Sequence, residues 1–105
     1  MEDLIQKILQ FRDERDWKQF HTPENLAKSI VLEAAELLEN FQWDNQYDKQ
    51  KVNEELADVM IYCVLMADCI DADVLKIIEE KMTKNSMKYP VEKAKGTSKK
   101  YTELE

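Results

Sequence analysis

The sequence of 105 residues contains only one glycine, two prolines, two cysteines and one histidine. Hairpin turns in β-sheets depend on glycine, proline and Asn-Gly pairs, so their scarcity argues against a sheet and predicts an all-helical fold. Two cysteines and one histidine are too few for a Cys/His zinc site. No apolar run approaches the ~20 residues that cross a bilayer, and no signal-peptide pattern opens the sequence. We therefore expect a cytoplasmic protein.

Charge is unevenly distributed along the chain, whose net charge is −7. Residues 1–75 carry 7 basic and 17 acidic side chains, whereas residues 76–100 carry eight lysines and three acids. A net acidic chain is a poor nucleic-acid binder, because affinity for a duplex depends on neutralising its phosphates. An acidic body followed by a lysine-rich segment suits a metal site beside a phosphate site.

Apolar periodicity and capping residues predict a single domain of four helices over residues 1–90, followed by a polar tail over residues 91–105. The helices are expected over about 2–16, from 23 to 40 or 43, from 48 to about 70, and from 71 to between 85 and 89. The expected N-caps of the last three are Thr22, Asp48 and Asp71. We expect a four-helix bundle-like domain that is oligomeric, because so short a chain buries a limited core.

Two pairs of acidic residues recur with the same spacing in consecutive apolar helices. The first pair is Glu33 and Glu36, and the second is Glu55 and Asp58. Residues three apart share one face of a helix, so the carboxylates of each pair repel one another. A divalent cation would reverse the sign of that interaction, and Mg²⁺ prefers carboxylate oxygens and water. The spacing thus favours a magnesium site over two solvated acidic faces.

The second helix places its acids at the edge of an apolar face. Stepping about 100° per residue groups the side chains expected to face the core, with Glu33 at the rim of this arc and Glu36 slightly beyond it. The arc comprises Leu26, Ile30, Ala34, Leu37 and Phe41. Glu39 points away and is expected to be solvated. A di-iron carboxylate bundle is excluded, because it needs Glu-x-x-His pairs and the single histidine precedes Pro23.

The order E-x-x-E, 18 residues, E-x-x-D resembles the all-alpha nucleotide pyrophosphohydrolases of MazG type. Residues 17–27, 54–62 and 81–90 are similar to the branch of that family that contains the dCTP pyrophosphatases, and the resemblance covers about residues 12–90. It implies Mg²⁺-dependent hydrolysis of a (deoxy)nucleoside triphosphate to the monophosphate and pyrophosphate. The substrate implied is dCTP or a related pyrimidine deoxynucleotide, and the role implied is cleansing of the nucleotide pool.

The resemblance also implies roles for individual residues. Glu33, Glu36, Glu55 and Asp58 are expected to hold Mg²⁺, with Mn²⁺ as a substitute, and Glu33 or Glu36 is expected to orient the attacking water. Phosphate binding is expected of Lys81, Lys84, Asn85 and Tyr89. Contacts to the base or sugar are expected of Trp17, His21, Asn25 and Trp43.

Proteins similar to this one assemble as dimers or tetramers, so a homodimer or homotetramer is expected, with neither nucleic acid nor membrane as a partner. The alternative interpretation is a non-catalytic helical oligomer that binds nucleotides or a protein partner. Such a protein would need no complete set of metal-binding acids.

Overall fold

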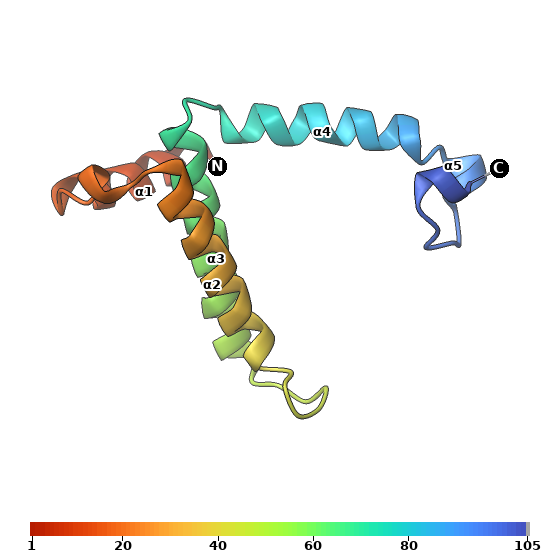
Figure 1. Cartoon of the computed structure of the whole chain (residues 1–105), viewed down its shortest axis with the longest axis horizontal. Coiled ribbons are helices and arrows are strands. Elements are labelled where there is room, and N and C mark those ends of the chain that lie inside the picture. The colour runs from red at the N-terminus through yellow and green to blue at the C-terminus, as the bar shows by residue number, and fades with distance from the viewer. Residues whose placement is uncertain (105) are drawn as a thin grey trace. The chain divides into compact units, whose positions relative to one another are not determined.

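The computed structural model describes residues 1–104, and every regular element in that range is helical (Figure 1). In chain order the elements are α1 (Glu2–Glu14), the 3-10 turn η1 (Lys18–Phe20), α2 (Pro23–Glu39), α3 (Lys49–Cys69), α4 (Val74–Lys88), α5 (Val91–Ala94) and the 3-10 turn η2 (Tyr101–Glu103). The all-helical prediction is confirmed. By length and hydropathy, none of the helices in residues 1–104 could span a bilayer.

The chain divides into two compact units between Ala72 and Asp73. The first contains α1, η1, α2 and α3, and the second contains α4, α5 and η2. Within the first unit, α2 and α3 lie side by side as a helical hairpin, and α1 packs against α3 (Figure 1). The hairpin carries both pairs of acidic residues.

Two of the three predicted N-caps are confirmed. The Thr22 hydroxyl accepts a hydrogen bond from the backbone N–H of Asn25 at 3.1 Å, with Pro23 at the start of α2. The carboxylate of Asp48 caps α3 in the same way. Each cap satisfies backbone donors that the first helical turn would otherwise leave unpaired.

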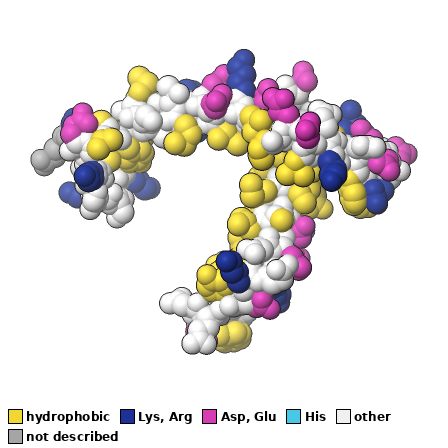
Figure 2. All heavy atoms as spheres, turned by 180° about the vertical axis from the view of Figure 1, so that it is seen from behind, with side chains coloured by type: hydrophobic (Ala, Val, Ile, Leu, Met, Phe, Trp, Pro, Cys, Tyr) yellow, Lys and Arg dark blue, Asp and Glu magenta, His cyan; other side chains and the backbone are white. Residues whose placement is uncertain are grey.

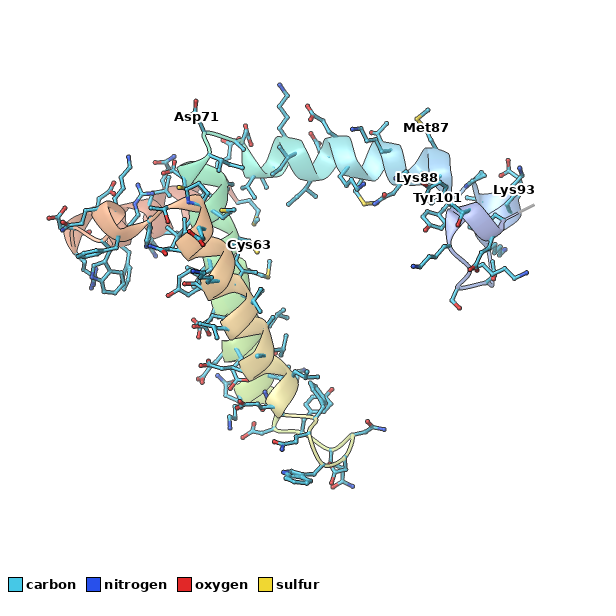
Figure 3. All side chains as sticks on the ribbon, viewed as in Figure 1. Cys63, Asp71, Met87, Lys88, Lys93 and Tyr101 are labelled. Carbon is cyan, nitrogen blue, oxygen red and sulfur yellow. The ribbon has the colours of Figure 1, made fainter. Side chains whose placement is uncertain are left out.

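Asp71 does not cap the fourth helix, so that prediction is wrong. Asp71 lies in the turn that follows α3, with a left-handed backbone (φ 58°) that aspartate tolerates better than most residues (Figure 3). The cap is Asp73, whose Oδ1 accepts from the backbone N–H groups of Leu75 at 3.1 Å and Lys76 at 3.2 Å. Asp71 is part of the turn that ends α3, so α4 begins two residues later and Asp73 becomes its N-cap.

The buried core is small. Among the described residues, the buried apolar side chains are Leu26, Leu65 and Ala67, and Leu26 is only 1% exposed. Arg12 on α1 is the one buried charged residue in the same range. The first unit is therefore centred where α1, the start of α2 and the end of α3 meet.

The predicted core-facing arc of α2 is largely confirmed. Beyond the buried Leu26, the side chains of Ile30, Leu37 and Phe41 are half-buried. Ala34 is exposed, so the prediction for that position is wrong. A single partner helix covers a narrower strip of α2 than a complete bundle would.

Residues 91–104, predicted as a polar tail, contain α5 and η2. The ring of Tyr101 lies edge-on to that of Tyr89, with the centroids 6.2 Å apart, and the Lys88 ammonium lies 4.8 Å from the centre of the Tyr101 ring (Figure 3). Such contacts combine apolar burial with cation–π attraction. They hold η2 against the end of α4.

We predict that Leu26→Ala lowers the free energy of unfolding by about 2–5 kcal/mol, the usual cost of emptying a buried leucine site. Urea denaturation followed by circular dichroism measures the change. Lys28→Ala is the control, because the Lys28 side chain lies on the same helix and is 67% exposed. An equal loss in the control would contradict the placing of Leu26 at the centre of the core.

Candidate functional site

The α2–α3 hairpin brings both acidic pairs to one region. Glu33 and Glu36 lie on α2, and Glu55 and Asp58 lie on α3. The side chain of Asn40, just after α2, donates a hydrogen bond to the carboxylate of Glu55, which fixes the register of the hairpin. The two helices run in opposite directions. Residues that precede Asn40 on α2, such as Glu33, therefore lie beside residues that follow Glu55 on α3, such as Asp58.

Glu33 lies at the centre of this cluster. Its Oε2 atom is buried and has no hydrogen-bond partner. Burial raises the pKa of its carboxyl above the usual value, and the neighbouring Glu36 carboxyl raises it further. The negative charges of Asp58 and Glu55 add smaller increases to the same pKa. The other three predicted acids are therefore within electrostatic reach of Glu33.

The donors in this cluster fit a hydrated divalent cation. A buried carboxylate oxygen without a partner is costly, and a cation would supply the missing partner. Within residues 1–104, no three Cys, His, Asp or Glu side chains are placed as a cage around a common point. Mg²⁺ needs no such cage, because it usually keeps several waters and takes one or two carboxylates directly.

Asn40 is a member of the cluster that sequence reasoning missed. Besides its bond to Glu55, its side-chain amide donates to the backbone carbonyl of Leu37 at 3.1 Å. It thus ties the last turn of α2 to an acid on α3. The available signal was its position four residues after Glu36, one helical turn further along the same face.

A shallow, open hollow of about 310 Å³, called the aromatic cavity below, lies on the surface of the first unit and is lined by Trp17, Phe20, His21 and Tyr62. Trp17 and His21 are two of the predicted base-contact residues, and the structure brings them together. Tyr62 was not predicted as a site residue, although it follows Asp58 on α3 by four positions. This spacing puts the cavity wall one turn, about 6 Å along the axis, from an acid of the cluster.

The connection between α1 and α2 forms most of the cavity wall. It begins at Asp16, whose left-handed backbone (φ 55°) turns the chain out of α1. Trp17 then packs edge-on against Phe11 of α1, with the ring centroids 5.7 Å apart. Its carbonyl accepts a hydrogen bond from the backbone N–H of Phe20 at 3.0 Å, which closes the turn η1. Local hydrogen bonds and one aromatic contact therefore set the positions of these rings.

The other two predicted base-contact residues do not line this cavity. The side-chain amide of Asn25 donates to the carbonyl of Phe20 at 3.1 Å, so Asn25 supports the cavity wall from behind. Trp43 is 88% exposed and lies in the connection after α2. The 17 residues of α2 separate it from His21, a distance of about 25 Å along the helix.

His21 is held in a largely apolar setting. Its Nδ1 atom is buried without a hydrogen-bond partner. Burial lowers the pKa of its imidazole, and the positive charge of Arg12 lowers it further. A neutral imidazole offers one donor and one acceptor, which suits the edge of an uncharged ring system.

The predicted phosphate-binding residues lie together on the second unit. Lys81 and Lys84 are exposed on α4, and Asn85 is half-buried on the same helix. Tyr89 ends α4, where its backbone N–H donates to the carbonyl of Asn85 at 2.9 Å. Their spacing places Lys81, Asn85 and Tyr89 along one side of α4, as the sequence indicated.

Comparison with known proteins gives matches over most of the chain. Residues 28–104 match the MazG-like family. The rat and human proteins named dCTP pyrophosphatase 1 are 37% and 38% identical to this chain, and each alignment covers 99% of the chain and 67% of the relative. The crystal structure of a pyrophosphatase from Archaeoglobus fulgidus superposes with a TM-score of 0.77 at 43% identity, covering 86% of this chain and 92% of that one.

The raised pKa of Glu33 predicts a pH-dependent penalty in the metal-free protein. A carboxyl whose folded-state pKa is raised contributes its stability fully below the unfolded value of 4.5 and loses it as the pH rises through the folded value. We expect Glu33→Gln to raise the melting temperature at neutral pH without divalent ions, and the gain to vanish near pH 4.5. Glu39→Gln on the solvated face of α2 is the control, and an equal gain there would contradict the assignment.

Proposed function

The chain belongs to the MazG-like family, and on that premise we propose that it hydrolyses nucleoside triphosphates between the α and β phosphorus atoms. The products are the nucleoside monophosphate and pyrophosphate. The substrate proposed is dCTP or a related pyrimidine deoxynucleotide, and the role proposed is cleansing of the cytoplasmic nucleotide pool. One observation carries the proposal: the aromatic cavity at Tyr62 lies one helical turn from the acidic cluster at Asp58.

The acidic cluster is the proposed metal and reaction centre. Its four acids, Glu33, Glu36, Glu55 and Asp58, would hold Mg²⁺, with Mn²⁺ as a substitute. When bound, the ion neutralises triphosphate charge and lowers the pKa of a coordinated water. Asn40 holds Glu55 in place through its hydrogen bond. Glu33 or Glu36 would orient the attacking water.

The aromatic cavity is the proposed site for the base. This hollow of about 310 Å³ is open to solvent, so a base could enter it directly. The rings of Trp17 and Tyr62 offer flat apolar surfaces, and neutral His21 offers a hydrogen bond to a base edge. Asn25 would act indirectly by holding the carbonyl of Phe20.

The four residues on α4 and at its end are proposed, as a group on the second unit, to bind phosphate. The ammonium groups of Lys81 and Lys84 would neutralise phosphate oxygens, while Asn85 and Tyr89 would donate uncharged hydrogen bonds. Lys81, Lys84 and Tyr89 are exposed and Asn85 is half-buried, so these groups are open to a ligand.

Self-assembly as a homodimer or homotetramer is supported by the apolar surface of the chain. On α2, Val31, Leu32 and Leu38 are exposed, and Figure 2 shows hydrophobic side chains facing solvent along the α2–α3 hairpin and on α4. Met60 on α3 and Met82 on α4 are also exposed and add to the apolar surface of their helices. Exposed apolar patches on a protein surface are typical of interfaces with another chain.

Turnover assays test the proposed reaction. Purified protein with Mg²⁺ and a panel of nucleoside triphosphates should release pyrophosphate, with the fastest turnover on dCTP or another pyrimidine deoxynucleotide. Glu36→Gln should lower kcat by about 100-fold or more, the scale of loss when a catalytic electrostatic group is removed. Glu39→Gln is the matched control on the same helix and should keep kcat.

Three results would contradict this proposal. Release of orthophosphate with a diphosphate product would exclude cleavage between the α and β phosphorus atoms. Absence of turnover on every nucleotide would favour a non-catalytic binding protein. Full activity of Glu36→Gln, with its helical circular-dichroism signal intact, would remove Glu36 from the reaction centre.

The assembly is tested separately by light scattering coupled to size-exclusion chromatography. We expect two or four times the mass of one chain. Val31→Glu should shift the mass toward that of the monomer, because a charge on an apolar contact face is costly to bury. A monomeric parent protein at micromolar concentration would contradict the proposed assembly.

A further inference from the structure

Arg12 is a buried charged residue with two carboxylate partners. It lies near the end of α1 and is 4% exposed. Its Nη1 donates to Oδ2 of Asp68 on α3 at 2.6 Å, and its Nε donates to Oδ1 of Asp13 at 2.8 Å. An arginine so deeply buried is stable only when its charge is paired, so the contact with Asp68 is a fixed link between α1 and α3.

This link connects the two helices that support the Trp17–His21 segment. On the α1 side, the carbonyl of Arg12 accepts a hydrogen bond from the backbone N–H of Trp17 at 3.2 Å. On the α3 side, the residue after Asp68 is Cys69, whose thiol donates to the carbonyl of His21 at 3.4 Å. The ion pair therefore spans the same two elements that hold both ends of the cavity wall.

The charges around His21 are few. From α1 its charged neighbour is Arg12, which lowers the pKa of the imidazole together with burial. From α3 its titratable neighbours are Cys69, at the His21 carbonyl, and Tyr62, across the cavity. Arg12 thus combines a mechanical link to this segment with a charge that opposes protonation of its histidine.

We propose that Arg12 and Asp68 are positioning residues for the nucleotide site: their ion pair fixes the Trp17–His21 wall of the cavity. The inference rests on the proposed function, since it assigns the cavity to the base. Neither Arg12 nor Asp68 lines the cavity itself. Both act through the segment that they hold.

The test uses Arg12→Met, which keeps the length of the apolar stem and removes the charge. His21 is the only histidine in the sequence, so its imidazole gives a single resolved titration by NMR. The pKa of His21 should rise toward the ordinary value of 6.5, because the positive charge is gone and the wall is less tightly held. For the preferred nucleotide, KM should rise by about fivefold or more with kcat changed by less than about twofold, since binding rather than chemistry is affected.

Two further variants separate this role from a general effect of charge removal. Arg12→Lys keeps a positive charge near Asp68 and should recover most of the parent KM and His21 pKa. Lys28→Met is the matched control: Lys28 pairs with Glu24 at 3.3 Å on the surface of α2, where both side chains are exposed. It should leave both readouts at the parent values, because exposed ion pairs contribute little.

A double variant guards against a folding failure. Arg12→Met combined with Asp68→Leu leaves no buried charge unpaired. The double variant should therefore be at least as stable to unfolding as the single variant. We still expect a raised His21 pKa and a raised KM, because the directional link and the arginine charge are both absent. Parent values for both readouts in the folded double variant, or in Arg12→Met itself, would overturn the proposal.

Failure of the proposed function is recognised separately. A parent protein without turnover on any nucleoside triphosphate would overturn the assigned reaction, but the His21 titration needs no substrate. A raised His21 pKa in Arg12→Met, against an unchanged value in Lys28→Met, would then still support the positioning role. Unchanged values in both would overturn it independently of the assays.

Discussion

Electrostatic repulsion among four carboxylates is the constraint around which the first unit is organised. The apolar strips of α2 and α3 hold the helices together. The same packing places Glu33 where the negative charges of three other acids repel its carboxylate. Burial without a partner at Oε2 adds to this cost. A fold that retains such an arrangement gives up stability in the free protein, and the proposed cation would restore it by neutralising the carboxylates.

The first unit separates two kinds of chemistry along α3. The first half of the helix presents Glu55 and Asp58, and the next turn presents Tyr62 to an aromatic cavity. A nucleotide has the same division, with an apolar ring at one end and a charged phosphate chain at the other. The order of polar and aromatic residues along one helix therefore matches the order of groups along the proposed substrate.

Features that depend on local spacing were predictable from the sequence. Thr22 and Asp48 cap the helices that they were expected to cap, and the two acidic pairs meet because each repeats a three-residue spacing in adjacent helices. Asn40 and Tyr62 were missed as site residues, because their roles depend on the register of the hairpin and on how the α1–α2 connection folds back. Asp71 was misassigned because a turn, rather than a helix start, follows α3.

The two connections that flank α2 differ in how they are held. Residues 15–22 are fastened by hydrogen bonds from Asn25 and Cys69 and by the packing of Trp17. The connection between α2 and α3 is exposed from residue 42 to residue 48. Lengthening an exposed loop costs little, because closure entropy grows only slowly with length. An added residue in the second connection would thus cost little, whereas the same change in the first would displace the aromatic rings of the cavity.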